Sequence, residues 1–188
     1  MAAGSWREEP IIPLSELLKI DGALSLVERA LSSFRCEKNS DEEDFLHNKA
    51  ISYERNNKAR TYLVYDDSYI HLLGYFTIAF KSIDLKNISK TKRKDMTAGE
   101  DVEVYLIGHI AKNSNMNTDL TGAHLLYHAK SVIAEARDLI GGRLIYIDCK
   151  DIEKLKTFYL DNGFKFFNTS EKQVCCNTIL RFNERDGE

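Results

Sequence analysis

Two side chains that can take up a proton, Glu103 and His109, occur in the short segment Val102–Ile110. Apolar and polar residues alternate through this segment, which is the period of a strand with one buried face. Glu103 and His109 share the other face with Tyr105. Either could act as a general base, directly or through water. Each also has an ordinary interpretation, because a glutamate at a strand end is usually solvated and a lone histidine usually packs or caps.

Other side chains with reactive chemistry give weaker patterns. His124 and His128 are four residues apart on a predicted helix, a spacing that can chelate zinc. The segment has no glutamate at the H-E-x-x-H position and no evident third ligand, so we predict no metal site. Cys149 ends a predicted strand, and nothing around it indicates a lowered thiol pKa, so we interpret it as a buried structural cysteine.

The elements that must position these groups are a strand and the helix after it. Apolar residues recur at three- and four-residue spacing from Gly122 to Ile140, which predicts a helix. A polar turn joins this helix to the strand Val102–Ile110. The backbone N–H groups of such a turn and the positive end of the helix point at one spot, which makes an anion site.

These residues resemble the GNAT superfamily of acetyl-CoA-dependent N-acetyltransferases, of the bacterial or phage type. The family usually carries Leu-Ala-Val, then Gln/Arg-x-x-Gly-x-Gly/Ala, then Leu-Leu. In this chain the three slots are filled without a gap by Ile110–Lys112, Asn117–Gly122 and Leu125–Leu126. Downstream, Phe158, Tyr159, Gly163 and Phe164 match the family's Phe-Tyr-x-x-x-Gly-Phe motif.

The resemblance implies which residues hold acetyl-CoA. Main-chain groups of Ile110, Ala111 and Lys112 would hold the pantetheine arm and face the acetyl oxygen. Backbone N–H groups would bind the pyrophosphate along the loop formed by Thr118, Asp119, Leu120, Thr121, Gly122 and Ala123. Tyr159 would be the acid that protonates the leaving thiolate, since a phenol, with a pKa of about 10, is similar in basicity to a thiol. Glu103 or His109 would then be the base.

The order of the motifs is most similar to the branch of toxins that acetylate aminoacyl-tRNA. That branch implies tRNA as the substrate and a neutralising antitoxin as a protein partner. A protein lysine, a protein N-terminus or a small polyamine stays open as the acceptor amine, and a homodimer stays open as the assembly. Leu120 and Asp119 depart from the Gly-rich loop of the family. They leave an alternative function, a GNAT-like CoA-binding or regulatory module without turnover.

The composition is typical of a globular protein. The chain has 188 residues, 43% hydrophobic and 29% charged, with a net charge of −3. These values argue against disorder and against a protein that coats nucleic acid through a uniformly basic face.

No apolar run approaches a membrane span of about 18 residues, and the start lacks a signal-peptide core, so we expect a cytosolic protein with reduced cysteines. One basic stretch is predicted to form a loop, with Lys86, Lys90, Lys92, Arg93 and Lys94.

The remaining pattern predicts an α/β fold with a mixed sheet and helices on both faces. The resemblance to the GNAT superfamily implies in addition that the central sheet is splayed. Two short helices, broken at Asp21-Gly22, are predicted before residue 35. A helix is predicted from about Asp41 to Asn57, and a hairpin from Thr61–Asp66 and Ile70–Phe80. Gly74 inside the hairpin predicts a bulge or a close backbone approach. We therefore expect an N-terminal helical extension, 1–40, and a GNAT-like domain, 41–188.

Overall fold

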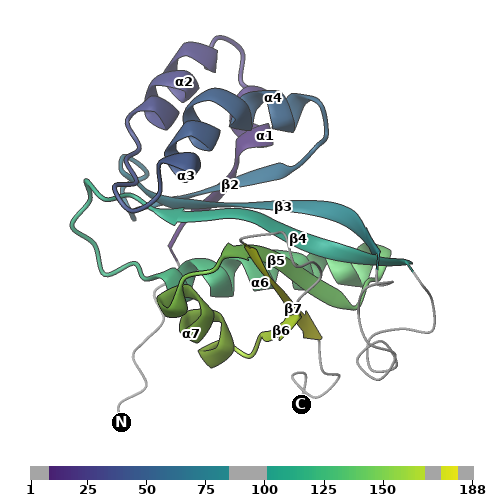
Figure 1. Ribbon diagram of the computed structural model, residues 1–188. Helices are drawn as coiled ribbons and strands as arrows, with labels where there is room; N and C mark the ends of the chain where they lie inside the picture. Colours follow the sequence, from purple (N-terminus) through teal and green to yellow (C-terminus); the bar gives the residue numbers. More distant parts are fainter. Residues whose placement is uncertain (1–8, 85–100, 168–174, 182–188) are drawn as a thin grey trace. The chain divides into compact units, whose positions relative to one another are not determined.

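A computed structural model describes residues 9–84, 101–167 and 175–181 of the chain (Figure 1). Within these ranges, a seven-stranded sheet has the order β1-β2-β3-β4-β5-β7-β6. The strands are β1 (Ile11–Pro13), β2 (Arg60–Tyr65), β3 (Leu72–Asp84), β4 (Asp101–Lys112), β5 (Leu144–Lys150), β6 (Lys165–Phe167) and β7 (Cys175–Arg181). The helices are α1 (Leu14–Leu18), α2 (Leu24–Ser32), α3 (Ser40–Asp44), η1 (Phe45–Lys49), α4 (Ala50–Arg55), α6 (Gly122–Ile140) and α7 (Glu153–Asp161). The predicted mixed α/β architecture is confirmed.

The chain forms two compact units. The first contains Met1–Thr77 and His109–Tyr127, and the second contains Ile78–Gly108 and His128–Glu188, as far as each is described. The predicted division at residue 40 stays a prediction. The basic stretch at 86–94 lies outside the described residues. No helix in the described part of the chain is long and apolar enough to span a bilayer.

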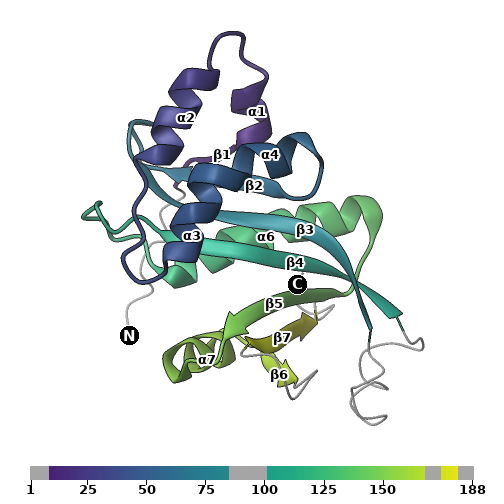
Figure 2. The same ribbon diagram turned by 45° about the horizontal axis from the view of Figure 1, so that its top comes forward.

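In the first unit, the predicted N-terminal helical pair is confirmed as α1 and α2. The predicted helix Asp41–Asn57 is also confirmed, but it is made of three consecutive pieces, α3, η1 and α4. Its middle piece, η1, is a π-helical turn, a form that is rare and often occurs at functional sites. Figure 2 shows α4 above β2, with β1 beside β2.

The helices and strands of the first unit share one apolar core. It consists of the buried residues Leu14, Val27, Leu31, Phe34, Cys36, Phe45, Leu46, Ala50, Leu63, Tyr65, Leu72, Tyr75 and Ala111. Tyr75 of β3 meets the rings of Phe34 and Phe45 from the helices. Its neighbour Gly74 instead faces Leu125 of α6, 3.0 Å from where a Cβ would stand. Successive strand residues point to opposite faces, so helices cover both faces of β3 in this unit.

The close approach predicted at Gly74 is confirmed. A Cβ at this position would also lie 3.0 Å from the carbonyl oxygen of Ala111 and 3.1 Å from Leu120. The limits of the predicted hairpin differ from the structure, where its strands are Arg60–Tyr65 and Leu72–Asp84. β3 begins at Leu72 because Tyr69, with φ +59°, and the exposed Ile70 belong to the turn. The sequence analysis also missed β1, a three-residue strand that pairs antiparallel with β2.

In the second unit, β4 pairs parallel with β5, with Tyr105 opposite Ile145. β5 and β6 both pair antiparallel with β7. The helix α6 ends at Ile140, as predicted, and the two glycines that follow, Gly141 and Gly142, have positive φ (74° and 113°), as is common after a helix end. The hydroxyl of Tyr105 donates a hydrogen bond to the carbonyl of Gly141, and its ring leaves no room for a side chain on Gly142.

Candidate active site

His109 lies in the first unit, where three groups hold it. Its Nδ1 is 3.0 Å from Oε2 of Glu42 on α3. Its ring stacks on that of Phe45 on η1, with centroids 3.7 Å apart and planes inclined by 18°. Its backbone N–H donates to Oγ1 of Thr77 at 2.9 Å. Glu42 and Phe45 are three residues apart, so successive turns of one helical segment present both to the imidazole.

Glu42 also contacts Tyr75. The Tyr75 hydroxyl lies 2.6 Å from the carbonyl oxygen of Glu42 and 3.0 Å from its Oε2. Burial of the Tyr75 side chain raises its pKa, and the negative charge of Glu42 raises it further. The phenol therefore keeps its proton and acts as a donor to Glu42.

The residues predicted to hold the pantetheine lie at the end of β4. The N–H groups of His109 and Asn113 donate to Thr77 Oγ1 and Leu73 O, both on β3, at 2.9 and 2.7 Å. Successive residues of a strand direct their N–H groups to opposite edges, so those of Ile110 and Lys112 point away from β3. Ala111 is buried and Lys112 is exposed. Two of the three predicted residues thus direct backbone N–H groups to the edge of this segment that faces away from β3.

Asn113 anchors the loop that follows β4. Its side chain is fully buried, and its Nδ2 donates to the carbonyl of Leu72 at 2.8 Å. Its Oδ1 accepts from the N–H groups of Arg35 and Asn115 at 3.2 and 3.1 Å. One side chain thereby joins β3, the segment after α2 and the start of the loop between β4 and α6.

Leu120 explains how the loop departs from the family motif and still folds. Its side chain is only 1% exposed and packs over Gly74, 3.1 Å from where a Cβ on that residue would stand. The bulk that replaces the usual glycine is therefore inside the protein, while Asp119, Thr121 and Gly122 are exposed and Thr118 is half-buried. The exposed side of the loop is made of small and polar residues.

The start of α6 has donors for an anion. Thr121 caps the helix, since its Oγ1 accepts from the N–H of His124 at 3.2 Å. Among the described residues, the N–H groups of Gly122 and Ala123 have no hydrogen-bond partner, as expected in a first helical turn. They fit a phosphate oxygen.

Tyr159 and Glu103 belong to the second unit. Tyr159 lies on α7, is 5% exposed, and packs edge-on against Phe158 and Phe164 with centroids 5.1 and 5.6 Å apart. Glu103 lies on β4 and is exposed. His109 and the loop residues Thr118–Ala123 belong to the first unit, and Tyr159 and Glu103 belong to the second.

In the part of the chain that the structure describes, no group of three or more His, Cys, Asp or Glu side chains is arranged to hold a metal ion. His128 is buried, and His124 is 3.7 Å from Glu9 in an ion-pair geometry. Cys149 is buried, as predicted.

Sequence reasoning missed Glu42 and Asn113. Glu42 is 67 residues from His109, and it stands in an acidic first turn that looks like ordinary helix capping. Asn113 lies in the polar turn after the predicted strand Val102–Ile110, where a polar residue is normal. Only the buried surroundings distinguish either residue from its neighbours.

No protein-family model matches the chain. Several solved structures are similar to it in fold. The toxin AtaT complexed with acetyl-methionyl-tRNAfMet is 21% identical, with a TM-score of 0.68 over 92% of this chain and 94% of that chain. A Tyr-to-Phe mutant of KacT is 19% identical, with a TM-score of 0.70 over 93% and 95%. AtaTR bound with acetyl-CoA is also 19% identical, with a TM-score of 0.69 over 93% and 95%.

Both units of the chain are included in these matches, because they cover more than nine tenths of its length. At such low identity the similarity is one of fold. The chain therefore has the same fold as AtaT and KacT, which agrees with the GNAT fold that its sequence motifs predicted.

Proposed function

We propose that the protein is an N-acetyltransferase that moves an acetyl group from acetyl-CoA to the amino group of aminoacyl-tRNA. The observation that carries this proposal is the fold similarity to AtaT, whose solved complex contains acetyl-methionyl-tRNAfMet. That ligand is an aminoacyl-tRNA with its amino group acetylated. The composition and loop chemistry of this chain are compatible with the same reaction.

The residues that would hold acetyl-CoA lie in the first unit. The N–H groups of Ile110 and Lys112 point away from β3 and are available to the pantetheine and the acetyl oxygen. The N–H groups of Gly122 and Ala123, at the positive end of the long helix α6, suit the pyrophosphate. Acetyl-CoA supplies a thioester, whose C–S bond is exchanged for a C–N bond to the acceptor.

Two proton transfers accompany this exchange. The attacking amine loses a proton as its C–N bond forms, and the departing CoA sulfur gains one as its C–S bond breaks. We assign the donor role to the phenol of Tyr159, the residue that matches the family's Phe-Tyr-x-x-x-Gly-Phe motif. Glu103 and His109 are the candidate bases, and the contacts of His109 favour it.

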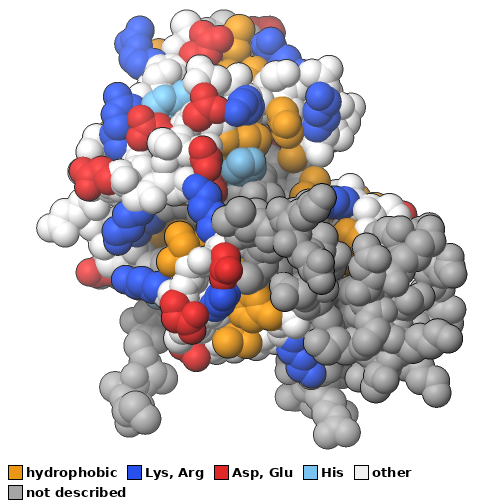
Figure 3. Space-filling model, in the orientation of Figure 1, with side chains coloured by type: hydrophobic (Ala, Val, Ile, Leu, Met, Phe, Trp, Pro, Cys, Tyr) orange, Lys and Arg blue, Asp and Glu red, His pale blue; other side chains and the backbone are white. Residues whose placement is uncertain are grey.

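The partners in this proposal are acetyl-CoA, an aminoacyl-tRNA and an antitoxin-like protein. The last rests on the solved complex of a mutant AtaT with the C-terminus of the antitoxin AtaR, which has a TM-score of 0.62 with this chain. A cytosolic location belongs to the same proposal because charged tRNA is found there. Figure 3 shows acidic and basic side chains interspersed over the helices of the first unit, so the tRNA would meet mixed charge on that face.

A thermal melt with and without acetyl-CoA tests cofactor binding. A ligand at 100 times its Kd raises the free energy of unfolding by about 2.7 kcal/mol. We expect a clear rise in Tm with acetyl-CoA and none with adenosine. No shift at millimolar acetyl-CoA would contradict the proposal.

Transfer is tested with labelled acetyl-CoA and bulk charged tRNA. We expect label in the tRNA fraction, falling steeply as salt rises, because phosphate contacts release counterions. Acetyl-CoA binding without transfer to any amine would instead support the alternative, a CoA-binding module that has lost turnover. Label in proteins or polyamines but not in tRNA would show that the acceptor amine is not that of aminoacyl-tRNA.

A further inference from the structure

We propose that Glu42 is a positioning residue that holds His109 with Nδ1 protonated, so that Nε2 takes the proton of the acceptor amine. This inference rests on the proposed acetyl transfer. It deepens that proposal by choosing His109 over Glu103 and by adding a residue that no motif indicates.

The hydrogen bond defines the tautomer. A carboxylate only accepts, so the 3.0 Å contact between Glu42 Oε2 and His109 Nδ1 requires a proton on Nδ1. In the neutral imidazole the lone pair then lies on Nε2. Among the described residues, no hydrogen bond occupies that nitrogen, and the His109 side chain is 29% exposed. The basic nitrogen is therefore the one that Glu42 does not contact.

Helix capping alone does not account for Glu42. Asn39 caps α3, and its Nδ2 lies 3.3 Å from Oε1 of Glu42, three residues on, which resembles a capping box. This contact uses only one carboxylate oxygen. The other oxygen, Oε2, is shared by His109 and the buried Tyr75. The carboxylate is thus held from two sides, with Oε2 directed at the imidazole.

The imidazole is equally constrained. Phe45 stacks on one ring face, and Thr77 fixes the backbone of His109 through its hydroxyl. Rotation of the ring would give up both the stacking and the bond to Glu42. A pre-set base needs no reorganisation as the reaction proceeds, and the charge of Glu42 stabilises the imidazolium that forms.

The tautomer of His109 can be measured without any activity. Long-range ¹H–¹⁵N NMR resolves the two ring nitrogens, and among the five histidines of the chain His109 is identified by its loss in His109→Gln. We expect the Nδ1-protonated form in the wild type and a shift toward the Nε2-protonated form in Glu42→Gln. A wild-type ring protonated mainly on Nε2 would overturn the inference.

Kinetics provide the second test, with acetyl-CoA and charged tRNA as substrates. His109→Gln should lower kcat about 100-fold and Glu42→Gln at least about tenfold, while KM for acetyl-CoA stays within about twofold. Glutamine still suits the capping position, so the helix should persist. Asp41→Asn, which removes the exposed neighbouring carboxylate from the same helical turn, should keep wild-type kcat.

The double variant separates positioning from general stability. If Glu42 acts through His109, Glu42→Gln should cost nothing further in the His109→Gln background. A second, independent loss of about tenfold there would overturn the inference. Absence of transfer by the wild type would refute the proposed function instead, and the NMR result would still decide whether Glu42 sets the tautomer.

Discussion

The two units hold their proposed catalytic side chains in different ways. His109 in the first unit is fixed by polar contacts, to Glu42 through its ring and to Thr77 through its backbone. The ring of Tyr159 in the second unit packs edge-on against two neighbouring aromatic rings. Hydrogen bonds specify which atom carries a proton, whereas packing specifies where a ring lies. A substitution that preserves the shape of a side chain should therefore change the proton arrangement around His109 when it is made at Glu42. Made at Tyr159, it should leave the ring packing intact.

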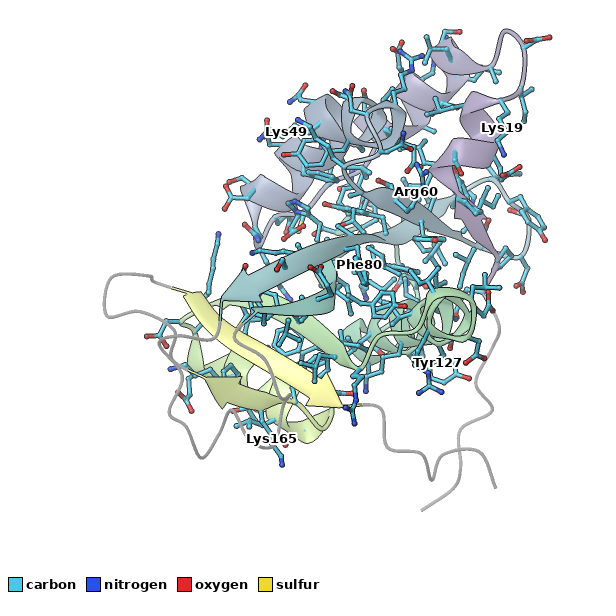
Figure 4. All side chains as sticks on the ribbon, turned by 90° about the vertical axis from the view of Figure 1, so that its right-hand side faces the viewer. Lys19, Lys49, Arg60, Phe80, Tyr127 and Lys165 are labelled. Atoms are coloured by element: carbon cyan, nitrogen blue, oxygen red, sulfur yellow. The ribbon has the colours of Figure 1, made fainter. Side chains whose placement is uncertain are left out.

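Tyr159→Phe gives the largest expected effect. The phenylalanine keeps the ring contacts with Phe158 and Phe164 but removes the proposed acid. We expect kcat to fall about 10²- to 10⁴-fold, with acetyl-CoA binding retained in a thermal melt. Tyr127→Phe, the same change at a 54% exposed position on α6 (Figure 4), is the matched control and should leave kcat unchanged. Undiminished turnover in Tyr159→Phe would remove Tyr159 from the mechanism.

Leu120→Ala asks whether packing also matters in the first unit. The buried side chain anchors the predicted phosphate loop above Gly74. Its loss should lower the free energy of unfolding by about 2 to 5 kcal/mol in urea denaturation. Leu139→Ala, at an 85% exposed site, should change it by less than about 0.5 kcal/mol. Equal effects of the two substitutions would show that Leu120 is not an anchor.

Asn113→Ala examines the polar anchor of the same loop. It deprives the carbonyl of Leu72 and the N–H groups of Arg35 and Asn115 of their partner. We expect a loss of about 1 to 3 kcal/mol in the free energy of unfolding. Acetyl-CoA binding, measured by calorimetry, should weaken as well. Asn115→Ala, at an exposed position, is the control, and a similar loss there would contradict the assigned role of Asn113.

Asp66 gives the smallest expected effect, in the turn before β3. Its carboxylate accepts from Nδ1 of His71 and from the N–H groups of Ile70 and His71, which hold the pKa of Asp66 well below its usual range. A carboxylate whose pKa is lowered by folding stabilises the protein at pH values above the ordinary aspartate pKa of about 4. This stabilisation is lost as the pH falls below that value, because the unfolded chain then binds a proton more readily than the folded protein does. The wild type should exceed Asp66→Asn in free energy of unfolding, and this difference should shrink as the pH is lowered from about 5 to about 3. A difference that widens would contradict this assignment, and Asp67→Asn should show no such trend.

Periodicity predicted most of the fold because most elements carry a complete pattern. The stripe from Gly122 to Ile140 and the alternation around Val104 gave α6 and β4 with nearly their observed limits. The three residues of β1 are too few for a period. The π turn at Phe45 was missed for another reason, since its residues have the same apolar spacing as an α-helix.

The candidate site was predictable only where it lies within one segment. Ile110, Lys112 and the loop to Ala123 follow each other in sequence, so a motif could indicate them together. Glu42 reaches His109 through the packing of α3 and η1 on β3 and β4, and no local pattern encodes that contact. Leu120 shows the converse, because a residue that looked like a defect in the motif is part of the core.

Competition among acceptors tests the central claim most directly. Labelled acetyl-CoA is offered to charged tRNA, to the same tRNA after removal of its amino acid, and to a lysine-containing peptide. The account predicts label on charged tRNA alone, recovered as an N-acetylated amino acid after ester hydrolysis and absent with Tyr159→Phe. Label on uncharged tRNA or on the peptide, with none on the amino acid, would contradict it.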